Sequence, residues 1–360
     1  MAEDRARAAR ADADLSTPWA GRLARWEALT VALLLSTIIV GSTSSEDFLT
    51  GGNLNSVLSD ITEVALISLP MTFIIVTGEI DLSVASILGL SSALLGSLWN
   101  HNWPMEAIIP FVLVVGGLAG ALNGLLVTRA GLPSLAVTIG TLTLYRGLAF
   151  VILGDQAVSD LPLGYTDWAF GTFAGTQIPN PFVVYVALAL VFGFVLHRTS
   201  FGRSLFAMGA NEEAAFFSGL RVKRIKLTLF VLSGAVAALA GVVISLRNST
   251  AAANVGIGFE LTVVTAVLLG GVSIFGGRGT IAGVVLALLL LGGIQKALLL
   301  SESISSYWIQ IVTGVLLIGS VLGPNLVQRA RTARAHSSRQ RGVWPSRPAA
   351  QRNPPQEEKA

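Results

Sequence analysis

Residues 107–128 read AIIPFVLVVGGLAGALNGLLVT, and no charged side chain interrupts them. A helix needs about 20 consecutive apolar residues to cross the hydrocarbon core of a bilayer. Residues 168–196, 227–246 and 303–328 form further long runs without a charge. These runs predict an all-α protein with several membrane-spanning helices.

The composition of the whole chain supports the same prediction. Hydrophobic residues make up 52% of the 360 residues and charged residues only 12%. The mean hydropathy of +0.69 is far from the balance of a soluble domain. A large soluble core would need many amphipathic helices to cover its buried helices, and the sequence shows none. We therefore expect a polytopic membrane protein.

Glycine, proline, asparagine and charged residues divide the chain into about ten expected spans. These lie at residues 28–41, 57–77, 81–99, 107–128, 132–153, 182–197, 227–246, 259–275, 281–300 and 304–322. The first is short and follows an arginine-bearing segment, a pattern also found in cleaved signal peptides. The leader is too long for a signal peptide, and no convincing cleavage site follows Gly41. We favour an uncleaved helix.

The distribution of basic residues predicts the orientation, because cytoplasmic loops retain lysine and arginine. With the N-terminus inside, only Arg146, Arg247 and Lys296 of the 24 basic residues fall outside cytoplasmic segments. The expected outer loops carry acids such as Glu46 and Asp155 instead. Both termini are therefore predicted to be cytoplasmic. That requires an even number of spans, and eight or ten satisfy it.

The two ends of the chain differ in composition from the apolar region between them. Residues 1–25 and 324–360 contain too few apolar residues to bury a core. We expect both to be disordered cytoplasmic tails, the second of them basic. Residues 26–323 form the expected membrane domain, interrupted by one long polar stretch at 198–226 with six basic side chains.

Several classes of site are missing from the sequence. The chain has no cysteine, and none of its four lysines follows a glycine, as a phosphate-binding P-loop requires. Its three histidines are far apart, so we expect no metal site. No nucleophile, base and orienting acid can be assembled. We expect no enzymatic activity, no cofactor and no nucleic-acid partner.

Glycine-rich and polar turns join some of the spans. In the turn at residues 78–83, Asp81 or Ser83 can cap the helix that follows. In the turn at residues 276–280, glycines supply backbone freedom. The spacing of Gly116, Gly120 and Gly124 gives two GxxxG patterns, typical of closely packed membrane helices. The expected structural turn residues are Gly78, Glu79, Asp81, Ser83, Gly276, Gly277, Arg278 and Gly279.

Three blocks of the sequence resemble the permease subunits of ABC sugar importers of the ribose, xylose and galactoside group. They read TGEIDLSVASILGLSSALLG (77–96), MGANEEAAFFSGLRVKRIKL (208–227) and FELTVVTAVLLGGVSIFGGRGTIAG (259–283), in the order of that family. The resemblance extends over residues 26–322. The shorter stretches GEIDLS, LGDQA and LHRTSFGR are most similar to rhamnose-type permeases, with autoinducer-import permeases next.

The resemblance implies a ten-helix permease of the bacterial inner membrane that translocates a monosaccharide, most specifically rhamnose. Ribose and autoinducer are the alternative cargoes. It implies a second permease subunit, identical or a sister chain, and an extracytoplasmic sugar-binding protein. It also implies a cytoplasmic ATPase with two nucleotide-binding halves, which would bind the ATP and magnesium.

The stretch 198–226 would then contain the helix that couples the permease to the ATPase. Asn211 can cap a short helix whose first turn carries acids, which suit the positive helix end. An apolar face for a partner groove is formed by Ala214, Ala215, Phe216 and Phe217, and an ordinary solvated loop is the alternative. The expected coupling residues are Asn211, Glu212, Glu213, Ala214, Ala215 and Gly219.

Polar residues inside the expected spans are candidates for the translocation path. An unpaired charge at the centre of a membrane helix costs about 2.5–3.5 kcal/mol, so such groups need partners or water. Structural pairing, for example of Arg146 with an acid, competes with contact to a sugar. The candidates are Asp60, Glu63, Asn123, Thr138, Thr141, Arg146, Glu260, Thr265 and Gln295.

Two other function classes remain open. An ion-driven secondary transporter would use inverted repeats and a membrane-embedded carboxylate. A membrane enzyme or a channel is the third class. The basic cytoplasmic stretch and the three ordered blocks favour the ATP-driven importer over both.

Overall fold

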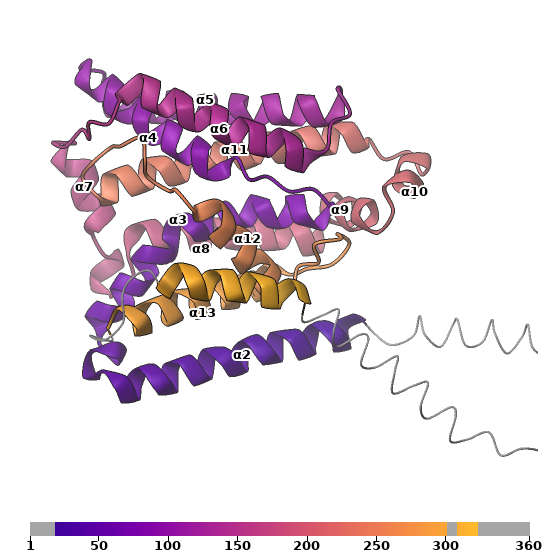
Figure 1. Ribbon diagram of the computed structural model, residues 1–360, viewed down its shortest axis with the longest axis horizontal. Helices are drawn as coiled ribbons and strands as arrows, with labels where there is room; N and C mark the ends of the chain where they lie inside the picture. Colours follow the sequence, from indigo (N-terminus) through magenta and orange to yellow (C-terminus); the bar gives the residue numbers. More distant parts are fainter. Residues whose placement is uncertain (1–18, 301–307, 323–360) are drawn as a thin grey trace, which may run out of the picture. The chain divides into compact units, whose positions relative to one another are not determined.

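The computed structural model describes residues 19–300 and 308–322 (Figure 1). Within these ranges the chain is helical and has no strand, only two isolated β-bridges. The helices are α2 (Trp19–Ser44), α3 (Gly51–Val76), α4 (Val84–Asn100), α5 (Met105–Thr128), α6 (Ser134–Leu153), α7 (Leu163–Phe170), α8 (Asn180–Arg198), α9 (Ser200–Ala210), α10 (Glu212–Phe217), α11 (Val222–Arg247), α12 (Phe259–Leu269) and α13 (Ile281–Leu299), with a further helix at Trp308–Leu322.

The long helices match the expected spans. Six described helices are long and apolar enough to cross a membrane, namely α3, α5, α6, α8, α11 and α13. Four shorter apolar helices lie at Ala28–Ser44, Val84–Asn100, Phe259–Leu269 and Trp308–Leu322. The prediction of an all-α polytopic membrane protein is therefore confirmed. The cytoplasmic placement of the termini stays a prediction.

The structure is more helical than expected in two stretches. Helix α2 begins at Trp19, so residues 19–25, predicted as part of a disordered tail, are helical because alanine, leucine and arginine favour helix. The polar stretch 198–226 is mostly helical as well, since α9 and α10 lie within it. Of the two predicted tails, residues 1–18 and 324–360 lie outside the described residues.

Helices α5 and α11 pack against each other through glycines. A Cβ atom at Gly120 would lie 2.0 Å from the carbonyl oxygen of Phe230, and one at Gly234 would lie 2.1 Å from that of Gly116. Small residues let membrane helices approach this closely, where the hydrophobic effect does not drive them together. The GxxxG spacing of α5 thus serves helix packing.

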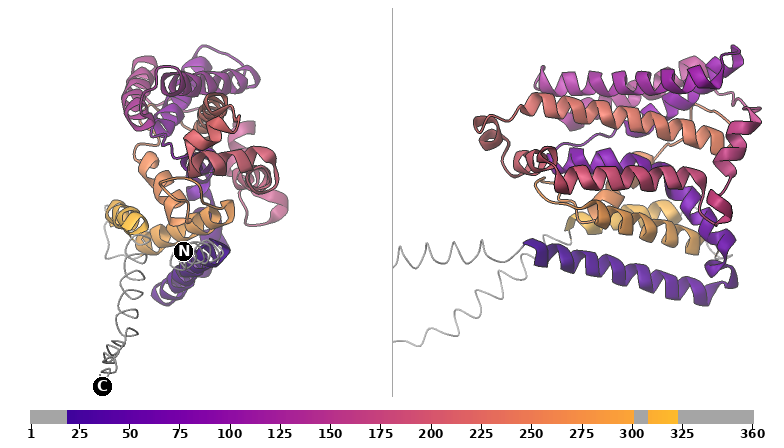
Figure 2. Two further views of the ribbon diagram at one scale, coloured as in Figure 1. Left: turned by 90° about the vertical axis from the view of Figure 1, so that its right-hand side faces the viewer. Right: turned by 180° about the vertical axis from the view of Figure 1, so that it is seen from behind.

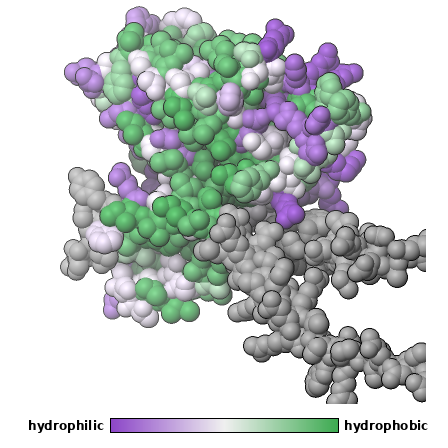
Figure 3. All heavy atoms as spheres, turned by 45° about the vertical axis from the view of Figure 1, so that its right-hand side comes forward, coloured by the Kyte–Doolittle hydropathy of each residue, from purple (hydrophilic) through white to green (hydrophobic). Residues whose placement is uncertain are grey.

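The other helices surround this pair in the same bundle. Helix α4 packs against α5, α6 and α11, while α3 packs against α8, α11, α12 and α13. Helix α2 packs along α13. Much of the flank drawn in Figure 3 is apolar, whereas hydrophilic residues gather toward the end that carries α9 and α10.

The connections fall at two opposite ends of the bundle (Figures 1 and 2). One end carries α9, α10, the α3–α4 turn and the loop at 270–280, which we call the α10 end. The other end carries α7 and is called the α7 end. There Val158 forms an antiparallel bridge with Ala251, and the Trp99 indole donates a hydrogen bond to the carbonyl of Asp160.

The expected span at 259–275 is placed differently in the structure. Helix α12 ends at Leu269, and residues 270–280 form a glycine-rich loop at the α10 end. After α11 the chain returns toward α12 through residues 248–258, which are not helical. This crossing therefore consists of residues 248–258, called the irregular segment below, and helix α12. Gly256 and Gly258, both with positive φ, explain why no helix forms before Phe259.

Candidate functional site

Helix α10 is a short surface helix with well-defined ends. The Asn211 side chain caps it by accepting a hydrogen bond from the Ala214 amide at 2.9 Å. Glu212 and Glu213 occupy the first turn, where the positive end of the helix dipole favours acids. Gly219 follows with a φ of +90°, a conformation that suits glycine.

The apolar residues of α10 point in two directions. Phe216 and Phe217 are 61% and 77% exposed, and their rings contact each other. Ala215 is buried in the chain itself, in a cluster with Met208 and Val222. Ala215 therefore holds α10 against α9 and α11 and does not belong to the exposed apolar face where the sequence placed it.

A lysine connects α10 with the α3–α4 turn. Lys226, at the start of α11, forms ion pairs with Glu212 of α10 at 2.7 Å and with Glu79 of the turn at 2.5 Å. The lysine side chain is only 9% exposed, while Glu212 is half exposed. We call these three residues the Lys226 cluster. Arg221, Lys223 and Arg224, by contrast, are exposed.

Glycines bring three backbone segments into direct contact beside this cluster. The Gly277 amide donates to the carbonyl of Val76 at 2.8 Å, and a Cβ atom at Gly209 would lie 1.9 Å from the same oxygen. Gly78, Gly276 and Gly277 all have positive φ. The α3–α4 turn, the end of α9 and the loop at 270–280 are thus packed backbone to backbone.

Arg278 lies on this loop with its side chain exposed. Its carbonyl accepts the amide of Ser273 at 3.0 Å, which closes the loop. Gly279 has a φ of +152° and leaves room for the Val272 side chain, which a Cβ atom would approach to 2.8 Å.

A buried polar network surrounds Asp81, two residues after Glu79 in the α3–α4 turn. The Asp81 carboxylate is fully buried and accepts hydrogen bonds from the Ser83 amide (3.0 Å), the Ser83 hydroxyl (2.6 Å) and the Ser233 hydroxyl (2.9 Å). The Asn123 amide donates to the Ser83 hydroxyl at 2.7 Å. The Tyr145 hydroxyl donates to the Ala119 carbonyl of α5 at 2.8 Å and makes a longer contact with the Asn123 side-chain oxygen at 3.3 Å. This Asp81 network joins the α3–α4 turn to α5, α6 and α11.

The turn is also held from α6. The Ile80 amide donates to the Ser134 hydroxyl at 3.2 Å, and its carbonyl accepts the Thr138 hydroxyl at 3.3 Å. Ser83 occupies the N-cap position of α4 but makes no side-chain cap bond, because its hydroxyl donates to Asp81. Of the two expected caps, the Asp81 carboxylate is the one that accepts an amide at this helix end.

Arg146 binds backbone and not an acid. Its guanidinium donates to the carbonyls of Ala253 (2.6 Å) and Val255 (2.8 Å) in the irregular segment, and to that of Ala85 (2.9 Å) in α4. A Cβ atom at position 89 would lie 2.2 Å from this guanidinium, so Gly89 makes room for it. The expected pairing of Arg146 with an acid is absent from the ion pairs of the described residues. Non-helical backbone leaves carbonyls unpaired, and Arg146 satisfies them.

Asp60 and Glu63 pair with a basic residue that the sequence left unassigned. Arg247, at the end of α11, contacts Glu63 at 2.9 Å and Asp60 at 3.3 Å. Glu63 is fully buried and Asp60 half exposed. These carboxylates of α3 therefore fasten α11, which is a structural role.

The remaining path candidates do not converge on one site. The hydroxyls of Thr141 and Thr265 donate to carbonyls of their own helices. Glu260 lies half-buried in the first turn of α12, and Gln295 lies half-buried on α13. No group of three acids or histidines in the described part of the chain is placed to hold a metal ion.

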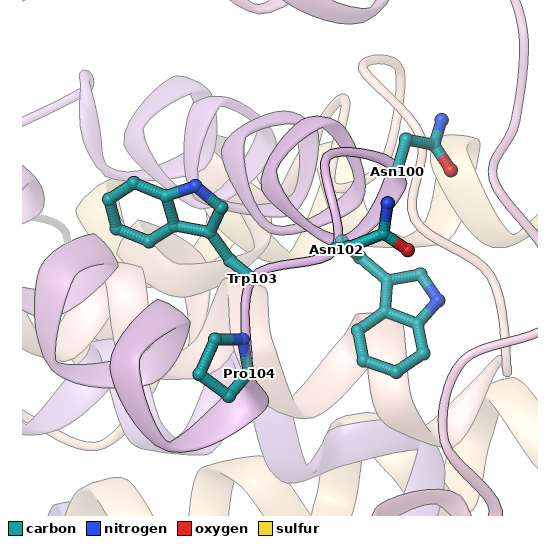
Figure 4. Close-up of a pocket in the computed structure, with 5 residues that line it drawn as sticks. Asn100, Asn102, Trp103 and Pro104 are labelled. Carbon is teal, nitrogen blue, oxygen red and sulfur yellow. The ribbon is translucent and has the colours of Figure 1, made fainter.

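The α7 end carries aromatic and amide side chains in an open setting. Trp99, Asn100, Asn102, Trp103 and Pro104 line a hollow at the corner between α4 and α5, where the Trp103 indole points away from the two asparagines (Figure 4). Nearby, the Tyr165 hydroxyl donates to the Glu106 carboxylate at 2.6 Å, which raises the pKa of the Tyr165 phenol. Such aromatic residues are typical of a membrane–water interface.

Sequence reasoning missed Lys226, Ser233, Tyr145 and Arg247 as site residues. For Arg247 a signal existed, because the acids Asp60 and Glu63 lie one turn apart on an apolar helix and require a cation. Lys226 was counted among the exposed basic residues of its loop. Its position one helical turn after the buried Val222 was the available signal.

Comparison with known proteins places these features in a family context. The sequence profile of the family described as "Branched-chain amino acid transport system / permease component" matches residues 53–321. No solved structure matches.

Three curated relatives illustrate the similarity. The L-arabinose ABC transporter permease protein AraH of Azospirillum brasilense is 38% identical over 76% of this chain and 80% of its own. The autoinducer 2 import system permease protein LsrD of Yersinia enterocolitica is 34% identical over 84% and 92%. The ribose import permease protein RbsC of Haemophilus influenzae is 33% identical over 82% and 91%.

Proposed function

Because the chain belongs to the branched-chain amino acid transport system / permease component family, we propose that it is the membrane-spanning subunit of an ATP-driven importer of a small sugar or sugar-like solute. Membership makes it a multi-pass permease of the inner membrane. The importer class and the cargo are the proposal.

The observation that carries this proposal is the geometry of α10. Two adjacent phenylalanines are exposed on a capped surface helix at the end of the bundle that is rich in polar residues. Exposed aromatic side chains on a short helix are typical of a surface that inserts into a partner's groove. We propose that this groove belongs to a cytoplasmic ATPase. In this proposal the ATPase, and not this chain, binds ATP and magnesium.

The nature of the cargo is supported by the relatives. Their names refer to arabinose, autoinducer 2 and ribose, all small hydroxyl-bearing solutes. Rhamnose, the specific expectation from the sequence, is not among these names. We propose a neutral monosaccharide or a related solute, with rhamnose as one member of the panel to test.

The remaining partners follow from the proposed importer class. They are a second permease subunit, identical or a sister chain, and an extracytoplasmic protein that captures the sugar and delivers it to the α7 end. This assignment agrees with the short connections at that end, where the longest described stretch between spans, residues 154–179, is too small to form a sugar-binding domain.

Transport in proteoliposomes tests the proposal. The chain is reconstituted with a candidate partner ATPase and a candidate sugar-binding protein, and uptake of labelled arabinose, ribose, rhamnose and autoinducer 2 is measured. Uptake should require ATP on the side of the membrane where the ATPase is bound. Ionophores, which abolish ion gradients, should not reduce it. Uptake that persists without the ATPase and is abolished by ionophores would identify a secondary transporter instead.

A pair of phenylalanine variants tests the docking surface. Replacing Phe216 and Phe217 by alanine should reduce copurification of the ATPase by about tenfold or more, as expected for the loss of buried aromatic anchors. Phe173→Ala is the matched control, because this phenylalanine is 53% exposed near the α7 end. Equal ATPase recovery from both variants would remove α10 from the interface.

A further inference from the structure

Lys226 occupies an unusual position for a lysine in this chain. Its side chain is only 9% exposed, and its ammonium group lies between two carboxylates from different segments, Glu212 of α10 and Glu79 of the α3–α4 turn. Burying a charge is costly unless it is paired and hydrogen-bonded. An apolar residue would fill the same space without that cost, so packing alone does not account for Lys226.

The attachment of α10 to the rest of the chain is otherwise slight. It consists of the small Ala215 cluster and the backbone hydrogen bond from Leu220 to Ala215. Three exposed basic residues, Arg221, Lys223 and Arg224, precede Lys226 on α11 or just before it and make no ion pair among those of the described residues. Lys226 is therefore the charged contact through which α10 is held against the bundle.

The turn that receives this contact is connected to the centre of the bundle. Glu79 is separated by one residue from Asp81, whose buried carboxylate binds Ser83 and Ser233. Through Ser83 the same network reaches Asn123 of α5, and the Tyr145 hydroxyl of α6 contacts α5 at the Ala119 carbonyl (2.8 Å) and at the Asn123 side-chain oxygen (3.3 Å). A displacement of Glu79 therefore has to displace or break hydrogen bonds to three helices.

Hydrogen bonds from α6 and close backbone packing hold this turn in place. The turn is fixed to α6 through Ile80 and packed against Gly276 of the 270–280 loop, where a Cβ atom would lie 3.0 Å from the Gly78 amide. Chains of hydrogen bonds and rigid segments are able to carry coupling between distant sites when the elements they join have two arrangements.

We propose that Lys226 is a positioning residue that transmits displacement of α10, through Glu79, to the Asp81 network and thereby to α5, α6 and α11. This inference rests on the proposed function, because the displacement comes from an ATPase docked on α10. Docking itself is assigned to Phe216 and Phe217, which are exposed, whereas Lys226 is buried. Docking and transmission are therefore separable by mutation.

Lys226→Met tests transmission, since methionine keeps an unbranched apolar side chain and removes the charge. The full chain is reconstituted with its ATPase and binding protein, and three quantities are measured at equal permease content: ATPase copurification, ATP hydrolysis, and uptake of whichever of labelled arabinose, ribose, rhamnose or autoinducer 2 the wild type transports. Lys223→Met, an exposed lysine on the same helix, is the matched control.

Uptake by Lys226→Met should fall by about tenfold or more, in the range of a typical coupling energy, while ATPase copurification stays within about twofold of wild type. Stimulation of ATP hydrolysis by the loaded binding protein should be lost. Lys226→Arg should restore most of the uptake, because it keeps the charge. Lys223→Met should behave as wild type.

Other outcomes are distinguishable. Wild-type uptake and wild-type stimulation in Lys226→Met would overturn the transmission role while leaving the importer intact. Failure of the wild-type chain itself to bind an ATPase or to need ATP would overturn the proposed function. If Lys226→Met does not accumulate in membranes, Glu79→Gln carries the same test with a smaller change, and wild-type uptake in that variant would refute the proposal.

Discussion

Replacement of Asp81 by alanine should destabilise the bundle more than its single polar side chain suggests. Three donors point at the Asp81 carboxylate in a fully buried site, namely the Ser83 amide, the Ser83 hydroxyl and the Ser233 hydroxyl. Alanine leaves all three without this acceptor. A buried donor left without a partner costs about 1–3 kcal/mol.

The structure decides how many of these donors remain orphaned. The Ser233 hydroxyl lies on α11 and can rotate toward a carbonyl of its own helix, as the Thr62 and Thr72 hydroxyls do at 2.6 and 2.7 Å. The Ser83 amide cannot rotate, and the Ser83 hydroxyl already accepts from Asn123. Two orphans at about 1–3 kcal/mol each give a loss of about 2–6 kcal/mol for Asp81→Ala.

Asp81→Asn provides the comparison within the same site. Its amide oxygen retains the Ser83 donors, and its amide nitrogen donates to the Ser233 oxygen once that hydroxyl turns away. The expected loss is below about 1 kcal/mol. Ser86→Ala is the control for removal of a buried hydroxyl, because the Ser86 hydroxyl bonds only the carbonyl of Ser83 three residues earlier.

Equilibrium unfolding in mixed micelles, followed through the tryptophan fluorescence of the chain, measures these differences. The expected order of stability is wild type, then Asp81→Asn and Ser86→Ala close together, then Asp81→Ala well below. If Asp81→Ala unfolds within about 0.5 kcal/mol of wild type, the range of a neutral surface change, the network does not stabilise the bundle.

Three further predictions concern packing, topology and titration. Gly120→Ala should destabilise the α5–α11 contact by about 1–3 kcal/mol through overpacking, whereas Gly140→Ala, at a helical glycine with open space around it, should not; equal unfolding free energies would contradict the glycine seam. A cysteine at the exposed position Glu213 in this cysteine-free chain should not react with an impermeant thiol reagent in intact cells, because α10 is predicted to be cytoplasmic. Labelling of this cysteine would contradict the predicted orientation. Glu106→Gln should lower the alkaline midpoint of Tyr165 ionisation in an absorbance titration, because the raised pKa of the phenol depends on that carboxylate. The stabilisation from this pair is complete below the ordinary tyrosine pKa and disappears as the pH rises through the raised pKa. An unchanged midpoint would refute the contact.

The positions of the helices were predictable from the sequence because apolar length is a strong signal. Each expected span coincides at least in part with a described helix, from α2 to the helix at Trp308–Leu322. The crossing before α12 was not predictable in the same way. Its irregular segment, NSTAAANVGIG at residues 248–258, is polar and rich in glycine, so the sequence indicates a loop between two spans and does not show that this loop crosses part of the bundle.

The side-chain contacts were less accessible to sequence reasoning. Local chemistry predicted the Asn211 cap, because the cap and the amide it binds lie three residues apart. Pairing with an acid was one of the two expectations for Arg146, yet its partners are the carbonyls of Ala85, Ala253 and Val255, which are distant in the sequence. That the last two carbonyls lack helical partners depends on the fold. Ala215 was assigned to an outer face because a six-residue helix carries too little periodicity to show which side is buried.

Helix α11 is tied near both of its ends to the same neighbour. Lys226 binds Glu79, just beyond the end of α3, and Arg247 binds Glu63 and Asp60 within α3. With a rise of about 1.5 Å per residue, the two fastenings lie about 30 Å apart, which is the thickness of a hydrocarbon core. Sliding of α3 along α11 would break one ion pair or the other. The two ion pairs therefore oppose sliding of α3 along α11, and we expect a tilt of one helix to carry the other with it.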